Sequence, residues 1–151
     1  MAINIGSKAP DFSLNDIDGN NVKLTDFGGK NVVLYFYPKD NTPGCAAEAC
    51  SFRDKFLKYK KKGIVVLGVS KDNEISHKNF IDKYKLPFTL LCDINGEVCK
   101  KYDCWGKKKL YGKEYEGILR KTFLIDKNGI IKYIFDKVNC ETHGEDVLEI
   151  F

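Results

Sequence analysis

The chain is poor in the features that mark exported, membrane-spanning or repetitive proteins. Its 151 residues contain no apolar stretch approaching the roughly 20 residues that a membrane-spanning helix needs. The opening MAINIGSKAPDF has no basic region followed by an apolar run, so we expect no secretory signal. Low-complexity tracts and internal repeats are absent as well. We therefore expect one soluble, cytoplasmic domain over residues 1–151, with no membrane partner.

Arginine is also scarce, because Arg53 and Arg120 are the only arginines among 25 basic residues. The formal net charge of +4 is small, and surfaces that bind nucleic acids usually combine arginine with interleaved aromatic residues. The lysine runs at 60–62 and 107–109 are more typical of a solvated helix end and a charged loop. We predict no nucleic-acid partner.

The six cysteines lack the spacing of a metal site. No CxxC pair occurs, four residues separate Cys45 from Cys50 and Cys99 from Cys104, and the two histidines are far apart in the sequence. Without an export signal a disulfide framework is not expected either, because the cytosol keeps thiols reduced. We expect no metal and no cofactor. Thiol catalysis is the main interpretation, and a cysteine-based metal-binding module is the weaker alternative.

The stretch PKDNTPGCAAEACSFR, residues 38–53, places a cysteine at the start of a predicted helix. The preceding residues 31–37, NVVLYFY, are typical of a strand, and the chain then turns through prolines and Gly44. From Cys45 to Lys62 there is no proline or glycine, and apolar residues recur at helical spacing. The free N–H groups and the dipole of a helix start favour an anion, so Cys45 is predicted to act as a thiolate nucleophile.

The spacing of Cys45 and Cys50 has a geometric consequence. On an intact helix, residues five apart have Cα atoms about 8 to 9 Å apart. A disulfide requires a Cα separation of less than about 7 Å. A bond between these two cysteines therefore requires at least the first turn and a half of the helix to unwind.

The rest of the pattern predicts an α/β fold with a mixed central sheet flanked by helices. An N-terminal β-hairpin is expected in residues 11–24, strands at 64–70 and 89–92, and helices from Ile75 to Leu86 and at 96–102. Residues 106–117 are expected to form a surface excursion. Strands at 121–125 and 130–135 flank the hairpin signal Asn128-Gly129, and a last helix is expected at 144–151.

Several of these residues resemble the peroxidatic-site signature of peroxiredoxins, specifically of the bacterioferritin comigratory protein or peroxiredoxin Q subfamily. They are Pro38, Thr42, Pro43, Gly44, Cys45 and Cys50. The resemblance continues along the chain in GSKAPDFSLND, VVLYFYPKDNTPGC, GIVVLGVSKD and WGKKKLYGKEYEGILRKTFLIDKNG. It implies a thioredoxin-like fold.

The resemblance also implies an activity, that of a thiol peroxidase that reduces hydrogen peroxide and organic hydroperoxides without a cofactor. Cys45 would be the peroxidatic residue and become a sulfenic acid, and Cys50 would resolve it as an intramolecular disulfide. Thioredoxin or a similar thiol reductant would then restore both thiols, and the protein is expected to be a monomer. A thiol-disulfide oxidoreductase or redox sensor on the same fold is the alternative, which the absence of CxxC disfavours.

The remaining site residues are also carried over from the resemblance. Thr42 would bond the thiolate and the peroxide, although it could equally be a plain helix N-cap. Pro38 and Pro43 would shape the pocket. Arg120 would lie against the thiolate and donate to the peroxide oxygens. Glu48 would orient Arg120, or would simply be an acid in the first helical turn that the helix dipole favours.

Four further cysteines are not required by this signature, namely Cys92, Cys99, Cys104 and Cys140. We interpret them as small buried apolar residues or idle thiols. The sequence leaves open that one of them takes part in resolution or in a secondary disulfide, with Cys99 and Cys104, near Trp105, as the first suspects.

Overall fold

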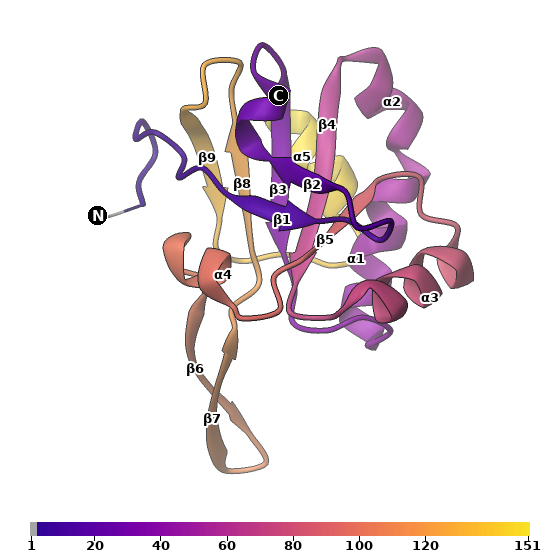
Figure 1. Ribbon diagram of the computed structural model, residues 1–151, viewed down its shortest axis with the longest axis vertical. Coiled ribbons are helices and arrows are strands. Elements are labelled where there is room, and N and C mark those ends of the chain that lie inside the picture. The colour runs from indigo at the N-terminus through magenta and orange to yellow at the C-terminus, as the bar shows by residue number, and fades with distance from the viewer. Residues whose placement is uncertain (1–2) are drawn as a thin grey trace.

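The structure is a computed structural model that describes residues 3–151 as a seven-stranded sheet with helices on both faces and a projecting two-stranded arm (Figure 1). None of the helices in this range is long and apolar enough to cross a bilayer. In chain order the elements are β1 (Ser13–Asn15), β2 (Asn21–Lys23), the 3₁₀ helix η1 (Leu24–Phe27), β3 (Asn31–Phe36), α1 (Pro43–Asp54), α2 (Phe56–Lys61), β4 (Ile64–Ser70), α3 (Glu74–Tyr84), β5 (Thr89–Cys92), α4 (Glu97–Lys101), β6 (Trp105–Leu110), β7 (Lys113–Ile118), β8 (Lys121–Ile125), β9 (Ile131–Phe135) and α5 (His143–Ile150).

The sheet runs in the order β2-β1-β5-β4-β3-β8-β9. Strands β3, β4 and β5 are parallel, whereas β1, β2, β8 and β9 join by antiparallel pairing, so the sheet is mixed. Strand β3 lies between β4 and β8 and is buried on both faces, which is why its sequence is apolar without interruption. The loop that carries the candidate site leaves the end of this central strand.

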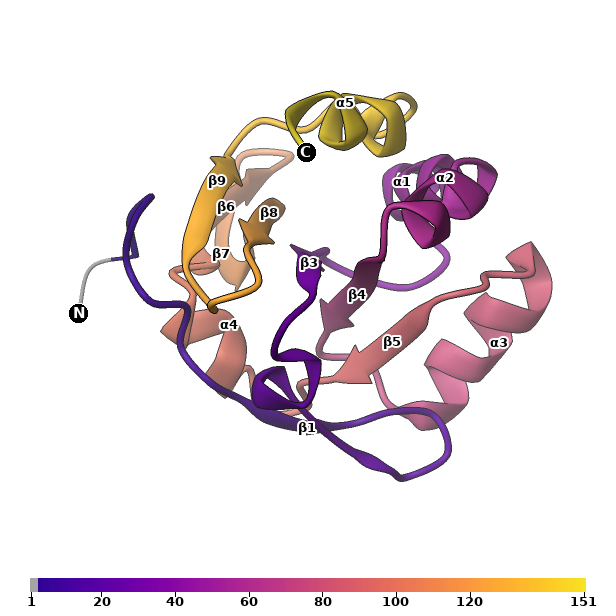
Figure 2. The same ribbon diagram turned by 90° about the horizontal axis from the view of Figure 1, so that it is seen from above.

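The side chains of β3 alternate between two separate cores. Val32, Leu34 and Phe36 pack on the face covered by α4 and the N-terminal segment. Val33 and Tyr35 pack on the opposite face, beneath α1, α2, α3 and α5. Figure 2 shows the two layers on either side of the sheet.

The predicted mixed sheet and its N-terminal hairpin are confirmed. Strands β1 and β2 pair through a turn at residues 16–20, and β8 and β9 pair across Asn128-Gly129. Gly19 and Gly129 have φ angles of 79° and 78°, in the left-handed region where glycine carries little strain. The strand predictions at 64–70 and 89–92 coincide with β4 and β5.

The prediction of one continuous helix from Cys45 to Lys62 is wrong. The helix stops at Asp54, and α2 starts at Phe56 after Lys55, whose φ and ψ of −107° and 6° are not helical. Tertiary contact explains the break, because the Tyr59 hydroxyl of α2 donates a 2.6 Å hydrogen bond to the Gly144 carbonyl of α5. Tyr59 is fully buried, so docking of its ring outweighs local helix propensity.

Two other predictions need correction. The helical spacing of Ile75, Phe80, Ile81 and Tyr84 predicts one apolar face for α3. Phe80 is fully buried as expected, but Ile75 is exposed, and the other buried residue of the helix is His77. Residues 106–117 do lie at the surface, as expected, but they form the regular hairpin β6–β7, which extends away from the main sheet (Figure 1).

Candidate active site

Cys45 occupies the first turn of α1, as the sequence predicts. Thr42 is the N-cap residue and Pro43 is the first helical residue, a position where proline loses no hydrogen bond. The Cys45 side chain is only 1% exposed and packs in the core beneath α1. Its thiol is therefore held in a fixed position at the positive end of a helix.

Arg120 brings a positive charge to this thiol. It lies in the short connection between β7 and β8, and its Nη2 donates a hydrogen bond of 3.3 Å to Cys45 Sγ. Its Nη1 donates at 2.5 Å to Glu48 Oε1. One guanidinium group thus joins a carboxylate and a thiol that both belong to α1, a charge-assisted arrangement that fixes its orientation.

Glu48 lies in the second turn of α1 and is fully buried. Its interpretation as an acid in the first helical turn is therefore wrong, whereas its contact with Arg120 is the one that the resemblance implies. Burial raises the pKa of Glu48 to about 7, although the charge and the hydrogen bond of Arg120 pull it down. A carboxyl in this state can hold or release a proton near neutral pH.

Thr42 does not cap the helix with its side chain. Its hydroxyl donates a 2.9 Å hydrogen bond to the Lys39 carbonyl, and no side-chain bond to the start of α1 is present. The role of this hydroxyl toward thiolate and peroxide stays a prediction. Pro38 and Pro43 stand at the two ends of the connection between β3 and α1, and their pocket-shaping role also stays a prediction.

Cys50 lies on α1 together with Cys45, and both are free thiols. Helix α1 is unbroken between them, so the two side chains are separated as the spacing predicts. Cys50 is partly exposed, and burial raises its pKa. The thiol pair is present but cannot form a bond in this conformation.

Behind Glu48 lies a buried histidine that the sequence analysis did not single out. His143 Nε2 shares a 2.7 Å hydrogen bond with Thr122 Oγ1 and lies 3.8 Å from Glu48 Oε2. Its ring packs edge-on against Phe52 and Phe135. Burial lowers the pKa of His143 to about 4, and the nearby positive charge of Arg120 acts in the same direction, so the ring is neutral at pH 7.

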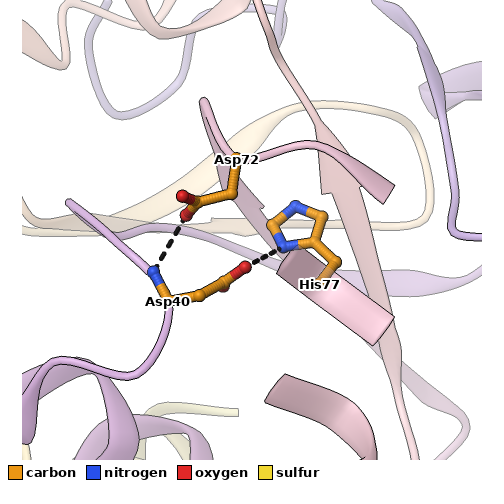
Figure 3. A group of neighbouring side chains, drawn as sticks. All are labelled: Asp40, Asp72 and His77. Carbon is orange, nitrogen blue, oxygen red and sulfur yellow. Dashed lines mark hydrogen bonds and ion pairs between the residues drawn. The ribbon is translucent and has the colours of Figure 1, made fainter. Parts of the chain in front are cut away.

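A second polar cluster holds the loop that precedes Cys45. Asp40 accepts a 2.6 Å hydrogen bond from the Tyr37 hydroxyl and one of 2.8 Å from the Ser76 hydroxyl, and it lies 2.7 Å from His77 Nδ1. The Asp40 backbone N–H donates to Asp72, which follows β4 (Figure 3). We call Asp40, Asp72 and His77 the anchor cluster, because it ties this loop to β4 and α3.

The hydrogen bonds define the charge of the anchor cluster. His77 Nε2 lies 2.9 Å from the Leu91 carbonyl, which can only accept, and Nδ1 faces a carboxylate that already accepts two hydroxyl donors. Both ring nitrogens therefore carry protons. Burial alone would lower the pKa of His77, but the hydrogen bond and charge of Asp40 outweigh it and raise the pKa.

This cluster also has the spacing of a metal site, with one ligand atom from each of its three members within 4.8 Å of one another. The hydrogen bonds argue for a different role, since both His77 nitrogens donate to oxygen and leave no lone pair for a cation. No cysteine belongs to the cluster. The anchor cluster is therefore better explained as a structural anchor than as a metal site. The sequence does not reveal it, because Asp40, Asp72 and His77 come from three separate segments.

The four extra cysteines lie in two different places. Cys92, Cys99 and Cys104 are buried, and burial raises the pKa of each, that of Cys92 to about 12. Cys99 and Cys104, the first suspects for resolution, pack in the core on the opposite face of the sheet from Cys45. Cys140 is instead partly exposed and lies beside Gly44, in the first turn of α1.

Comparison with known proteins shows that the chain is similar to members of one family along most of its length. Residues 5–134 match the profile of the AhpC/TSA family. The chain is 47% identical over 149 residues to Peroxiredoxin Bcp of Bacillus subtilis, covering 99% of this chain and 95% of that protein. It is 47% identical over 143 residues to Peroxiredoxin Bcp of Escherichia coli K12, covering 95% and 92%. Among solved structures, the bacterioferritin comigratory protein of Xanthomonas campestris superposes with a TM-score of 0.90 at 34% identity, covering 99% and 94%.

Proposed function

Because the chain belongs to the AhpC/TSA family and is a thiol peroxidase of the Bcp type with a thioredoxin-like fold, we propose that Cys45 attacks the peroxide. Peroxide substrates and a thiol reductant follow from the family. The observation that supports this assignment to Cys45 is the contact of its Sγ with Arg120 Nη2 at the start of α1. Of the six cysteines, Cys45 alone receives a described hydrogen bond from a guanidinium group.

The first step is the reaction of Cys45 with the peroxide. The Cys45 thiolate attacks the terminal oxygen of a hydroperoxide, the O–O bond breaks, and the second oxygen leaves as an alkoxide or hydroxide that takes up a proton. Cys45 becomes a sulfenic acid and the peroxide becomes an alcohol or water. Arg120 stabilises the thiolate and donates to the oxygens as negative charge develops on the leaving group. Glu48 keeps the guanidinium group in this orientation.

The second step is resolution by Cys50. Its thiol attacks the Cys45 sulfenic acid, a disulfide forms, and the oxygen leaves as water. The first turn and a half of α1 must unwind for the two sulfur atoms to meet, so we expect resolution to be limited by local unfolding. Unwinding also withdraws Cys45 from Arg120 and exposes the disulfide to a reductant.

The finer identity of the partners is part of the same proposal. Thioredoxin would reduce the Cys45–Cys50 disulfide through a mixed disulfide. Hydrogen peroxide and organic hydroperoxides would both be substrates, and the Xanthomonas campestris relative is described by its alkyl peroxide reduction activity. We propose a monomer that acts in the cytoplasm. The hydrogen bonds from Arg120 to Cys45 and Glu48 form within one chain and need no residue from a second subunit.

Coupled peroxide consumption tests this function. With thioredoxin, thioredoxin reductase and NADPH, the wild-type protein should consume hydrogen peroxide and cumene hydroperoxide, and Cys45→Ser should abolish both activities. Cys92→Ser is the matched control, because its thiol is buried outside the site, and its rate should equal that of the wild type. Full activity of Cys45→Ser would refute the assignment of Cys45 as the peroxidatic residue.

A further inference from the structure

Cys140 lies beside the peroxidatic cysteine although it is far from it in the sequence. Gly44 precedes Cys45, and a Cβ placed on Gly44 would lie 3.7 Å from Cys140 Sγ and 3.3 Å from Arg120 Nη2. The same Arg120 nitrogen donates to Cys45 Sγ. Glycine at position 44 therefore leaves room for a thiol and a guanidinium group against the start of α1, and Arg120 lies next to both cysteines.

The position of Cys140 differs from that of the three idle cysteines. It belongs to the connection between β9 and α5, in a turn closed by the hydrogen bond from the Thr142 N–H to the Asn139 carbonyl. Its side chain is partly exposed, whereas Cys92, Cys99 and Cys104 are buried. Cys140 itself lies outside the helices and strands, two residues before Thr142, the N-cap of α5, so an approach of its side chain to Cys45 does not require α1 to unwind.

The charges around Cys140 change when Cys45 is oxidised. Burial raises the pKa of Cys140, the positive charge of Arg120 lowers it, and the negative charges of Glu48 and of the Cys45 thiolate raise it. Conversion of Cys45 to a neutral sulfenic acid removes one of these negative charges and frees Arg120 from the thiolate. Cys140 thus becomes easier to ionise at the moment when a sulfenic acid is available for attack.

We propose that Cys140 is a second resolving thiol for Cys45. The proposal rests on the assignment of Cys45 as the peroxidatic residue. Cys140 sulfur attacks the sulfenic sulfur of Cys45, the S–O bond breaks, an S–S bond forms, and the oxygen leaves as water with the proton of the Cys140 thiol. The peroxide has already supplied the oxidation, and the thiol reductant of the catalytic cycle returns both residues to thiols.

The two resolving routes differ in what must move. Cys50 reaches Cys45 only when α1 unwinds, whereas Cys140 requires displacement of the β9–α5 connection. The second route therefore protects a sulfenic acid that forms while α1 stays folded. It captures Cys45 before a second peroxide can oxidise it to a sulfinic acid.

The test uses the full chain with Cys50→Ser, which removes the first route. The reduced variant receives one equivalent of hydrogen peroxide without reductant, and intact mass and peptide mapping follow. We expect loss of two hydrogens, mapped to a Cys45–Cys140 bond. The double variant Cys50→Ser/Cys140→Ser should lose this bond, retain a sulfenic acid that dimedone traps, and accumulate sulfinic acid with excess peroxide. In the control Cys50→Ser/Cys92→Ser the Cys45–Cys140 bond should persist.

Each other outcome overturns a separate claim. A Cys45 sulfenic or sulfinic acid beside a free Cys140 thiol in Cys50→Ser would refute the second route and leave the peroxidase intact. A bond from Cys45 to Cys92, Cys99 or Cys104 would refute it as well. An unmodified Cys45 after peroxide has been consumed would instead refute the proposed function. Circular dichroism of each variant establishes that the fold is retained, and Cys140→Ala repeats the test with a residue that introduces no polar group.

Discussion

The two histidines of this chain are both buried, yet their environments shift their pKa values in opposite directions, so that one ring is charged and the other neutral. His77 donates from both ring nitrogens to Asp40 and Leu91, and its pKa is raised. His143 shares one hydrogen bond with Thr122, lies between two aromatic rings near Arg120, and its pKa is lowered to about 4. A buried histidine is charged only where a paired carboxylate offsets the cost of desolvation.

The two histidines belong to two groups of residues near Cys45 that differ in how completely their polar atoms are hydrogen-bonded. The anchor cluster has hydrogen bonds to both Asp40 oxygens and holds the loop in place. The cluster around Arg120 keeps a neutral His143 and leaves Glu48 Oε2 and His143 Nδ1 without a hydrogen-bond partner among the described residues. A cluster whose polar atoms are all hydrogen-bonded favours a rigid loop. A cluster with unpartnered polar atoms retains groups whose protonation or hydrogen bonding can change when Cys45 changes charge.

Breaking the anchor cluster should produce the largest loss of stability. Asp40→Asn leaves a protonated His77 without its counter-charge in the core, which should cost about 3 to 5 kcal/mol. Urea unfolding measures the change. Asp54→Asn is the control, because that carboxylate is 64% exposed and should contribute little. Equal stabilities of the two variants would contradict the charged state of His77.

Disrupting the cluster of Arg120, Glu48 and His143 should affect the rate of peroxide reduction more than the free energy of unfolding. Arg120→Met removes the donor to the thiolate and to the developing negative charge, and we expect kcat/KM to fall by about 10²- to 10³-fold. Arg53→Met removes the other arginine, at the opposite end of α1, and should leave kcat/KM unchanged. Stopped-flow kinetics of peroxide reduction compare the two variants. Equal losses of kcat/KM in both would show that Arg120 has no specific role in the reaction.

The pH dependence of stability should sharpen the contrast between Glu48 and His143. The pKa of Glu48 rises from 4.5 to about 7 on folding, so its contribution to stability is lost as pH rises through that window. The pKa of His143 falls from 6.5 to about 4, so its contribution is lost as pH falls through that window. Between pH 4.5 and 6.5 the two contributions oppose each other. The His77 contribution is lost only above this window, because its folded pKa is raised above 6.5.

Single substitutions should separate these two opposite dependences of stability on pH. Relative to the wild type, Glu48→Gln should gain stability as pH rises from 4.5 to 6.5, because the His143 contribution remains. His143→Gln should lose stability over the same range, because the Glu48 contribution remains. Chemical denaturation across the range measures both. Identical pH profiles for the two variants would contradict the assigned shifts.

The smallest effect is expected at Thr122. Thr122→Val leaves His143 Nε2 without its hydrogen bond, which should cost about 1 to 3 kcal/mol of unfolding free energy. Thr122→Ser keeps the hydroxyl and should recover most of that loss. Thermal and urea unfolding compare the two, and a Val variant as stable as the Ser variant would exclude a structural role for this bond.

Local patterns in the sequence predict the elements but not the contacts between them. The apolar run of β3, the Asn128-Gly129 turn and the helix start that carries Cys45 each follow from a few adjacent residues. The break at Lys55 was missed because its cause, Tyr59, acts through a distant helix. The position of Arg120 was available only through family resemblance, since an arginine before a strand carries no signal of its own. His77, His143 and Cys140 have partners from other segments, which spacing along the chain cannot reveal.

The most direct measurement is intact mass with peptide mapping of the reduced wild-type protein after one equivalent of hydrogen peroxide, with no reductant present. We expect a rapid loss of two hydrogens, with a Cys45–Cys50 bond as the main product, which requires α1 to unwind. A Cys45 that remains a free thiol after the peroxide has been consumed would contradict the central claim, because another group would then have to be the site of attack.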